Sequence, residues 1–549
     1  MDERSCGEHV PFLLKDYGVD TVFGMPGVHS LEFYRSLEEA GVRHVSVRHE
    51  QGAGFMADGY ARASGKPGVA MLISGPGVTN ASTAIGQAYS DSIPVLMLTA
   101  AIATGDMGLG RGMLHEITDQ QAATAPLTGL SAMALTADQV PAYFAQIFTR
   151  FKTQRPRPAH LSIPLDVLEM PLVKAKALKR IPECPGPNRE VIQQLTDMLI
   201  SAKSLVILAG GGAVKASSFL QGIVEQSGAL FVTTVAGKGI LPESHPLSLG
   251  STLQRLPTRQ AIAEADLVIA IGTEIAEPDL YVTADVEAAG DVDPAMLEPR
   301  LFMSGEFIRI DIDPDTVVRD YNPDLAIVAD AVQTAQLIAE ALSDHRTDST
   351  ARAEQARVIR QANTATLSKL EKVHDDVLRA LRSGLPDDAL VYVDMTQIGY
   401  TGCVTFPVEQ PGCWQFPMGF GTLGYALPAA IGGQIACPDR ACVVVVGDGG
   451  LQFTLQELAT AVESKLPIPI VLWDNETLGE IADFMRARQI PQTGVYPLNP
   501  DFKTLAAAYG AGYTAPQTAK DITEAVSQAL LAEGPTFVHV RQKTLMQGG

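Results

Sequence analysis

The sequence predicts an α/β protein built from three parallel-sheet domains, and three observations support this fold class. The chain has 549 residues, which is too long for one hydrophobic core when a domain usually takes roughly 100–200 residues. Short apolar runs rich in β-branched residues recur along the chain, with helical stretches between them. These runs are continuously apolar, which is typical of strands that are buried on both faces of a parallel sheet.

The first domain is expected over residues 1–175. Its strand-like runs lie at residues 20–23, 45–47, 69–73 and 95–99. A stretch rich in proline and lysine follows, with the sequence PLVKAKALKRIPECPGP at residues 171–187. Because such stretches usually lie on the surface between domains, the first boundary is placed there.

Two further domains are expected, a middle one over residues 188–345 and a last one over residues 365–549. A charged, helical stretch from about residue 330 to residue 375 closes the middle domain. The strand-like runs of the middle domain lie at residues 204–209, 267–271 and 308–312, and those of the last domain at residues 389–394, 442–446, 468–473 and 536–540. The first and last domains look alike in architecture.

The composition limits the classes of function. Hydrophobic residues make up 46% and charged residues 19%, as in an ordinary soluble globular protein, so disorder and membrane partners are not expected. A net charge of −21 argues against a nucleic-acid partner, because that affinity is carried by clustered lysine and arginine. The six cysteines show no metal-ligand spacing and no signal peptide precedes them, which predicts a reducing, cytoplasmic compartment.

The strongest motif joins two strand ends of the last domain. Gly447-Asp448-Gly449-Gly450 follows one apolar run, and Asp474-Asn475-Glu476-Thr477 follows the next, so that Asn475 comes 27 positions after Asp448. Ligands bind at the carboxyl ends of parallel strands, where Asp448 and Asn475 can offer oxygen ligands to a divalent cation. Glycines there let the backbone approach a diphosphate. The alternative, an ordinary Gly-Asp-Gly turn, does not explain the second half of the pattern.

A second motif lies where a short strand of the first domain meets a helix. It reads Arg48-His49-Glu50-Gln51-Gly52-Ala53, and Glu50 is its candidate for chemistry. The alternative is a glutamate that merely suits the positive end of a helix. The loop Ser74-Gly75-Pro76-Gly77-Val78-Thr79-Asn80 follows the next strand and favours a functional role.

A third motif, GFGTLGYALP at residues 419–428, opens a helix of the last domain. Its Leu423 is either a functional residue or a core leucine, since most leucines are in the core. At the end of the first strand of this domain lies the tetrapeptide Asp394-Met395-Thr396-Gln397.

Together these motifs resemble the signature of thiamine-diphosphate enzymes of the acetolactate synthase and 2-oxo acid decarboxylase superfamily. The resemblance covers essentially the whole chain, in the order pyrimidine-binding, middle and diphosphate-binding domain. It implies thiamine diphosphate and Mg²⁺ as cofactors. In this family each active site lies between two subunits, which implies at least a homodimer and often a homotetramer.

The resemblance also assigns roles to particular residues. Asp448, Asn475 and the main-chain carbonyl of Thr477 would bind Mg²⁺. Glu50 would contact N1′ of the aminopyrimidine ring and shift the ring to the form whose 4′-nitrogen removes a proton. Leu423 would hold the two rings of the cofactor in a V. The other residues that the resemblance places at the cofactor are Pro26, Asn80, Thr396, Gln397, Gly421, Gly449 and Gly450.

The middle domain contains the turn Gly210-Gly211-Gly212-Ala213. This turn departs from the Gly-x-Gly-x-x-Gly pattern of dinucleotide loops at Lys215, so it is interpreted as a tight connection between a strand and a helix. Some relatives bind FAD in this domain, but the sequence does not indicate FAD here.

Within the superfamily the chain resembles the 5-guanidino-2-oxopentanoate decarboxylases. The resembling stretches are FGMPGVHSLEFY at residues 23–34, RHEQGAGFMADGYAR at 48–62, GRGMLHEITDQ at 110–120 and WDNETLGEI at 473–481. The resemblance places Glu480 and Phe484 where acetolactate synthases have an apolar residue and a tryptophan. A carboxylate at position 480 suits a guanidinium group, and its alternative is a glutamate that faces solvent.

His115 lies in the stretch where relatives place groups over the reacting carbon. It is expected to relay a proton, since an unperturbed histidine titrates near neutrality, unless it is simply a surface residue. Asp474 departs from the family pattern, which often has asparagine before the ligand asparagine.

The predicted reaction is the non-oxidative decarboxylation of 5-guanidino-2-oxopentanoate to 4-guanidinobutanal and CO₂, a step of arginine breakdown. One alternative is an acetolactate synthase-like carboligase that condenses two 2-oxo acids. Another is a catalytically silent regulatory homologue, against which the joint presence of Glu50, Asp448 and Asn475 argues.

Overall fold

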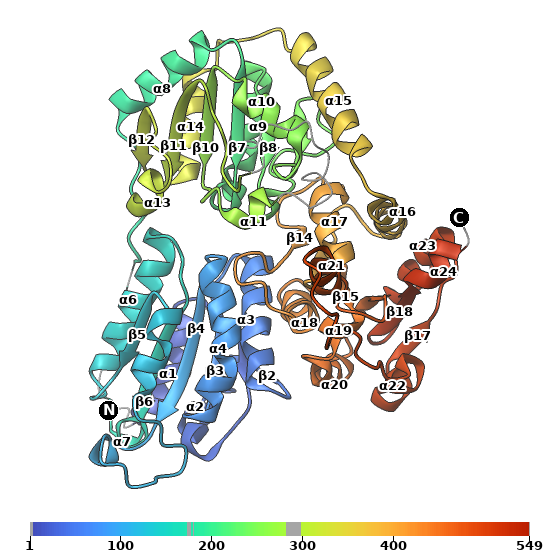
Figure 1. Cartoon of the computed structure of the whole chain (residues 1–549). Coiled ribbons are helices and arrows are strands. Elements are labelled where there is room, and N and C mark those ends of the chain that lie inside the picture. Colours follow the sequence, from blue (N-terminus) through green and yellow to red (C-terminus); the bar gives the residue numbers. More distant parts are fainter. Residues whose placement is uncertain (1–3, 173–176, 179, 282–297, 548–549) are drawn as a thin grey trace.

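The computed structural model describes residues 4–172, 177–178, 180–281 and 298–547. These residues form three sheets, each of six parallel strands with flanking helices, which confirms the predicted fold class (Figure 1). In Figure 1 the middle sheet lies at the top, the first sheet below it at the left and the third sheet at the right. Part of the proposed boundary stretch at residues 171–187 lies outside the described residues.

The first sheet has the strand order β2-β1-β3-β4-β6-β5. Its strands are β1 (Thr21–Gly24), β2 (Arg43–Ser46), β3 (Gly68–Leu72), β4 (Val95–Ala101), β5 (Leu130–Met133) and β6 (Ala159–Pro164). Its helices are α1 (Cys6–Asp16), η1 (Val28–Ser30), α2 (Leu31–Tyr34), α3 (Glu50–Ser64), α4 (Pro76–Ser90), η2 (Thr104–Asp106), α5 (Gln120–Thr124), η3 (Ala125–Leu127), α6 (Gln139–Thr153) and α7 (Leu165–Glu169). All strands run parallel, so their carboxyl ends meet at one edge.

The middle sheet has the strand order β12-β11-β10-β7-β8-β9. Its strands are β7 (Leu205–Ala209), β8 (Leu230–Thr233), β9 (Ser248–Gly250), β10 (Leu267–Ile271), β11 (Glu306–Asp311) and β12 (Leu325–Val328). Its helices are α8 (Arg189–Ser201), η4 (Gly211–Ala216), α9 (Ser217–Ser227), η5 (Val235–Gly237), α10 (Leu256–Ala263), α11 (Glu277–Leu280), α13 (Pro314–Val318) and α14 (Ala331–Ala341). The turn after β7 leads directly into η4, as the sequence predicted.

The third sheet has the strand order β14-β13-β15-β16-β18-β17. Its strands are β13 (Leu390–Val393), β14 (Trp414–Gln415), β15 (Cys442–Gly447), β16 (Pro469–Asp474), β17 (Gly512–Thr514) and β18 (Thr536–Arg541). Two helices lead into it, α15 (Thr350–Ala365) and α16 (Lys369–Ser383), and the others are α17 (Gln397–Thr405), α18 (Ala426–Ala436), α19 (Asp448–Leu451), η7 (Leu455–Glu457), α20 (Leu458–Glu463), α21 (Gly479–Ala487), α22 (Phe502–Tyr509), α23 (Ala519–Ala529) and α24 (Gln542–Gln547).

The first and third sheets share one hydrophobic core, in which α3 packs against α18. Glycines let these two helices approach backbone to backbone, because a Cβ atom at Gly59 would lie 2.0 Å from the Ala429 carbonyl oxygen. A Cβ atom at Gly432 would lie 1.9 Å from the Met56 carbonyl oxygen. Any larger side chain at either position would force the helices apart.

Buried polar groups also hold α3 against α18. Arg62 of α3 donates to Asp58 and to Asp91, at 2.7 Å in each case. The hydroxyl of Tyr425, which directly precedes α18, donates to Asp58 at 2.8 Å. The two units are therefore held in one arrangement by directional contacts as well as by apolar packing. Within the described part of the chain, every helix is too short or too polar to cross a membrane.

Candidate functional site

The carboxyl edge of the third sheet brings the two halves of the strongest motif together. Strands β15 and β16 are parallel neighbours, and Gly447 lies opposite Trp473 in their register. Asp448 begins α19 directly after β15, and Asn475 follows the last residue of β16. The 27-residue separation in sequence therefore becomes adjacency in space.

Asp448 is a buried carboxyl with a specific partner. The amide nitrogen of Asn499 donates to its Oδ2 at 2.6 Å and also to Asp474 Oδ1 at 3.2 Å. Burial raises the pKa of Asp448 to about 6, and the neighbouring Asp474 also raises this pKa while Asn499 lowers it. The edge therefore holds two closely spaced carboxyl groups, and a cation bound there would relieve their repulsion.

Asp474, which departs from the family pattern, has its own partner in the structure. His539 Nε2 lies 2.8 Å from Asp474 Oδ2, and both side chains are buried. Burial works to raise the pKa of Asp474, but the hydrogen bond and charge of His539 outweigh it and hold the pKa below its usual value. His539 thus offsets the additional carboxylate beside Asp448.

The segment after β16 forms a tight turn. Glu476 has a φ of 57°, in the left-handed region, and the Thr477 amide donates to Asn475 Oδ1 at 3.2 Å. The Thr477 hydroxyl is held by the carbonyl of Val495 at 2.9 Å. This turn places Asn475 and Thr477 on neighbouring positions of one short loop.

Gln397 links this loop to the start of α17. Asn475 donates to Gln397 Oε1 at 3.2 Å, and Gln397 donates to Asp483 of α21, also at 3.2 Å. Thr396 is the residue that precedes α17, and a Cβ atom at Gly447 would lie 2.9 Å from its hydroxyl. The structure therefore brings Thr396 and Gln397 to the same edge as the metal-ligand candidates.

The glycines of the motif are closely packed, so a side chain at either position would crowd a neighbour. A Cβ atom at Gly450 would lie 2.8 Å from an oxygen of Asp394, and one at Gly449 would lie 3.0 Å from Leu478. Leu423 is only partly buried, so it is not an ordinary core leucine, and its Cδ2 lies 3.7 Å from the Cβ position of Gly450.

Asp394 fixes the turn that carries Gly421 and Leu423. Its carboxylate accepts from the amides of Gly424 at 3.0 Å and Ala426 at 3.1 Å. Burial raises the pKa of Asp394 to about 6, although these hydrogen bonds work in the opposite direction. Gly421 adopts a φ of 65°, a conformation that other residues rarely take.

The carboxyl edge of the first sheet holds the second group of predicted residues. Glu50 is the first residue of α3, and the Asn80 side chain of α4 donates to Glu50 Oε2 at 3.0 Å. Both side chains reach solvent, Asn80 more than Glu50. Pro26 is exposed in the turn after β1, where the neighbouring Gly27 lies close to Ile73.

His115 belongs to a histidine pair that the sequence did not reveal. Its ring stacks edge to face on His29 with 5.0 Å between centroids, and His29 Nδ1 lies 2.8 Å from the hydroxyl of Ser74. His115 has a φ of 61°, and its buried Nδ1 has no hydrogen-bond partner among the described residues. An unpaired ring nitrogen of this kind is free to meet a ligand.

Buried contacts hold the loop of His115 in place. Gln120 accepts from the Gly75 amide at 2.9 Å and donates to the Ala100 carbonyl at 2.8 Å. Burial, and then the proximity of His115, lower the pKa of His29. His29 therefore tends to stay neutral beside its partner.

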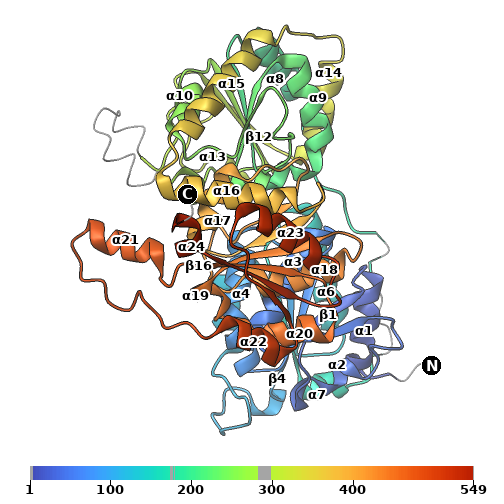
Figure 2. The same cartoon turned by 90° about the vertical axis from the view of Figure 1, so that its right-hand side faces the viewer.

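Glu480 lies in the first turn of α21, three residues after Thr477. The side chain is partly buried, and its charge acts on Tyr400 of α17, whose pKa is raised by burial and then by Glu480. Phe484 of the same helix meets Tyr281 of the middle unit with 6.4 Å between ring centroids. Figure 2 shows α21 standing out from the third unit on a long loop that leads to α22.

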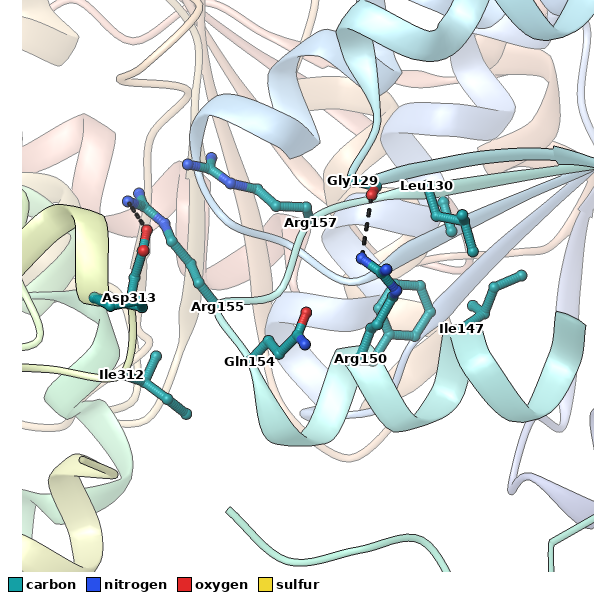
Figure 3. A pocket seen from close by; sticks show the side chains of 12 residues that line it. Gly129, Leu130, Ile147, Arg150, Gln154, Arg155, Arg157, Ile312 and Asp313 are labelled. Atoms are coloured by element: carbon teal, nitrogen blue, oxygen red, sulfur yellow. Dashed lines mark hydrogen bonds and ion pairs between the residues drawn. The ribbon is translucent and has the colours of Figure 1, made fainter. Parts of the chain in front are cut away.

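A separate cavity of about 410 Å³ lies between the first and middle units, away from these two edges (Figure 3). It is lined by Arg150, Arg155 and Arg157 of the first unit and by the segment 312–314 of the middle unit. Arg155 pairs there with Asp313 at 3.7 Å. None of the predicted site residues lines this cavity, so its size alone does not identify the functional site.

No group of three or more histidine, cysteine, aspartate or glutamate side chains in the described ranges could hold a metal ion. A cation site at the third edge would therefore combine one carboxylate with an amide oxygen and a main-chain carbonyl. Such an oxygen set suits Mg²⁺, which usually keeps water or substrate phosphate among its ligands.

Sequence reasoning did not find His29 or Asn499. Each is a single residue without a spacing pattern, and Asn499 stands in an Asn-Pro dipeptide that is typical of any turn. Their contacts depend on loops that only the folded chain brings together.

Three family models match the chain. A thiamine pyrophosphate enzyme N-terminal TPP-binding domain matches residues 4–123, the central domain of these enzymes matches residues 192–338, and the C-terminal TPP-binding domain matches residues 394–540.

Full-length relatives agree with these matches. The chain is 43% identical to a probable 2-ketoarginine decarboxylase of Pseudomonas aeruginosa, over 98% of this chain and 94% of that protein. It is 31% identical to the large subunit of acetolactate synthase isozyme 1 of Escherichia coli, over 97% of this chain and 93% of that protein. It is 30% identical to a probable acetolactate synthase large subunit of Methanococcus aeolicus, over 94% and 88%.

Proposed function

Because this chain belongs to the thiamine pyrophosphate enzyme family, we propose that it decarboxylates 2-ketoarginine, which is 5-guanidino-2-oxopentanoate, to 4-guanidinobutanal and CO₂. The family membership confirms the expectation of a thiamine-diphosphate enzyme. The observation that carries the substrate is Glu480, a partly buried carboxylate placed directly after the Asn475–Thr477 loop.

The residues at the two edges fit the cofactor. Asp448, Asn475 and the carbonyl of Thr477 form an oxygen set that would hold Mg²⁺. The Gly449-Gly450 segment has no side chains and would let a diphosphate approach its backbone. Glu50 and Asn80, joined by their hydrogen bond, would hold the aminopyrimidine ring. When bound, thiamine diphosphate supplies the nucleophilic carbon and the electron sink for the loss of CO₂.

Residues of the chain itself would supply the proton transfers and the contacts to the cofactor. Glu50 would hold a proton at the ring nitrogen that it faces. His115, with its unpaired Nδ1 and its neighbour His29, would deliver the proton that replaces CO₂ on the product carbon. Leu423, which is partly buried beside Gly450, would contact the bound cofactor from the third unit.

Glu480 would select the substrate. A guanidinium group can form a bidentate ion pair with this partly buried carboxylate, which an apolar oxo acid cannot do. The neighbouring Tyr400 and the aromatic contact between Phe484 and Tyr281 would cover the aliphatic part of the chain. Pyruvate, with only a methyl group, is expected to be a poor substrate.

We also infer that the working unit is a dimer at least, with a tetramer as the larger option. Among the described residues no hydrogen bond connects Glu50 or Asn80 with Asp448, Asn475 or Thr477. Two copies of the chain can complete a site that needs both groups, if one copy contributes the edge with Glu50 and the other contributes the edge with Asp448.

The test is CO₂ release by the purified protein with Mg²⁺ and thiamine diphosphate, measured in parallel on 2-ketoarginine, pyruvate and a branched apolar oxo acid. We expect a kcat/KM for 2-ketoarginine at least about 100-fold above that for pyruvate, since an ion pair that only the guanidino substrate can form contributes a few kcal/mol. Efficient use of pyruvate with a hydroxyketone product would instead identify a carboligase like the acetolactate synthases among the relatives.

The Glu480→Gln variant sharpens this test. Its KM for 2-ketoarginine should rise by about tenfold or more while its kcat/KM for pyruvate stays the same or increases. Glu524→Gln, an exposed carboxylate on α23, is the matched control and should behave like the wild type. Equal losses on both substrates in Glu480→Gln would contradict the assigned role.

A further inference from the structure

Glu457 is a fully buried carboxyl group to which the chemistry above gives no task. It ends η7 and is the N-cap of α20, nine residues after Asp448, and its relative exposure is 0%. Burial raises the pKa of Glu457 to about 7, although several hydrogen bonds work to lower it. A buried carboxyl is costly unless it satisfies other polar groups, so its partners indicate its role.

The partners of Glu457 are backbone amides of the first unit. Its Oε1 accepts from the amide of His49 at 2.9 Å and from the amide of Arg48 at 3.1 Å, while Oε2 accepts from the Thr460 hydroxyl at 2.9 Å. His49 is the N-cap of α3, and Glu50 is the first residue of that helix. The carboxylate from the third unit therefore binds the two amides that directly precede Glu50.

The fit around this contact is close on both sides. A Cβ atom at Gly52 would lie 2.4 Å from Glu457 Oε1, so the start of α3 rests directly on the carboxylate. The Thr460 hydroxyl of α20 also lies 3.3 Å from the carbonyl oxygen of Ser46, the last residue of β2. The whole turn from β2 to α3 is thus held by residues 457–460 of the third unit.

The turn decides where the Glu50 side chain points. Asn80 restrains the carboxylate of Glu50 from one side, but the main chain that carries it is fixed by Glu457. Errors of about 1 Å in the position of a reacting group can cost about 100-fold in rate. A residue that fixes this turn therefore acts on the reaction without touching the cofactor.

We propose that Glu457 is a positioning residue for Glu50: its buried carboxylate holds the turn between β2 and α3 and so fixes the main chain from which the Glu50 side chain extends. This inference rests on the proposed function, since it takes Glu50 as the group that meets the cofactor. It assigns to Glu457 a role in cofactor binding and in kcat, beyond the joining of two units.

The experiment compares Glu457→Ala, Glu457→Asp and Glu457→Gln with the wild type. Alanine removes the acceptor, aspartate keeps the charge but cannot reach the amides, and glutamine keeps an acceptor oxygen for both amides. Glu463→Gln is the matched control, because Glu463 pairs with the Arg48 side chain at 2.5 Å from the same helix but is exposed.

Three readouts are needed, namely kcat, the affinity of the apoprotein for thiamine diphosphate with Mg²⁺ by calorimetry, and hydrogen exchange of the amides in residues 46–52. Alanine and aspartate should each lower kcat and cofactor affinity by about tenfold or more and speed exchange in this turn by a similar factor. In Glu457→Gln the kcat, the cofactor affinity and the exchange rate should each lie within about threefold of the wild type. The control Glu463→Gln should behave like the wild type in all three measurements.

The inference is overturned if the aspartate variant folds with unchanged kcat, cofactor affinity and exchange in the turn, or if glutamine is as damaging as alanine. Hydrogen exchange needs neither cofactor nor substrate. A wild type that releases no CO₂ from any oxo acid would therefore refute the proposed function, while the exchange result alone would still decide whether Glu457 holds the turn.

Discussion

The middle sheet and the two outer sheets are built alike, but their carboxyl edges differ. At the outer edges Glu50 and Asp448 begin helices directly after strands, whereas the middle edge faces the first unit across the cavity that residues 312–314 line. There the Gly212 amide donates to the Gly272 carbonyl at 3.0 Å, and Arg155 of the first unit pairs with Glu274 at 2.5 Å. The fold thus supplies three equivalent edges, and the residues at the strand ends decide which of them can react.

The largest effect is expected from the two outer edges. Glu50→Gln and Asp448→Asn should each lower kcat by about 10²–10⁴-fold, the usual range for removing an acid or a key electrostatic group. Steady-state CO₂ release measures this loss, and circular dichroism shows whether the variants remain folded. A folded Glu50→Gln variant with full activity would mean that the carboxyl edge of the first sheet contributes no acid to the reaction.

Mixing the two inactive variants tests whether each site takes one edge from each of two chains. In a mixed dimer one site keeps both Glu50 and Asp448, so subunit exchange at equal amounts should restore about a quarter of the wild-type activity. If both edges served a site within one chain, mixing would restore nothing.

A smaller effect is expected on the pH dependence of stability, through two aspartates at the carboxyl edge of the third sheet. Burial raises the pKa of Asp394 and of Asp448 to about 6, above the value of an unfolded aspartate. The folded apoprotein therefore binds more protons than the unfolded chain between about pH 4 and pH 6, so its stability should fall as pH rises through this window. For Asp394 alone the loss is on the order of 3 kcal/mol.

Mg²⁺ with thiamine diphosphate should reverse this trend, because a cation binds the ionised form of Asp448. The added stability, measured as the shift in thermal midpoint, should be larger at pH 7.5 than at pH 5. In Asp448→Asn the shift should be small at both values. A cofactor-induced shift that is greatest at low pH would contradict the assignment of Asp448 as a ligand.

Much of the fold could be predicted from the sequence, because the central strands are continuous apolar runs. All the strand-like runs identified in the three domains correspond to strands, among them β15 and β16, which lead into Asp448 and Asn475. The edge strand β12 escaped prediction because only one of its four residues is buried. Strand β6 is fully buried yet contains His160 and Ser162, whose polarity is satisfied by Thr99 at 2.8 Å and 3.1 Å.

The candidate site was predictable where motifs lie at strand ends. Asp448 and Asn475 share an edge because parallel strands end together, and the Glu50–Asn80 contact follows from neighbouring helices of one unit. Glu457 and His29 could not be predicted, since their partners are backbone amides and rings brought close by the packing of separate loops. Sequence spacing carries no information on such contacts.

The smallest effect on activity is expected at the middle edge. Arg155→Met would remove the 2.5 Å partner of Glu274, which is partly buried, and this should lower the free energy of unfolding by about 1–2 kcal/mol. The kcat should stay within about twofold of the wild type, because this edge carries no reacting group. Urea unfolding and CO₂ release measure the two quantities.

Arg319→Met is the control for this last variant, since Arg319 also pairs with Glu274, at 3.4 Å, but is half exposed. Its loss should cost less than about 1 kcal/mol, as for other surface ion pairs. A tenfold fall in kcat in Arg155→Met with unchanged stability would mean that the middle edge communicates with the reaction. All three sheets would then contribute to the reaction, and they would differ only in the ligands that their carboxyl edges bind.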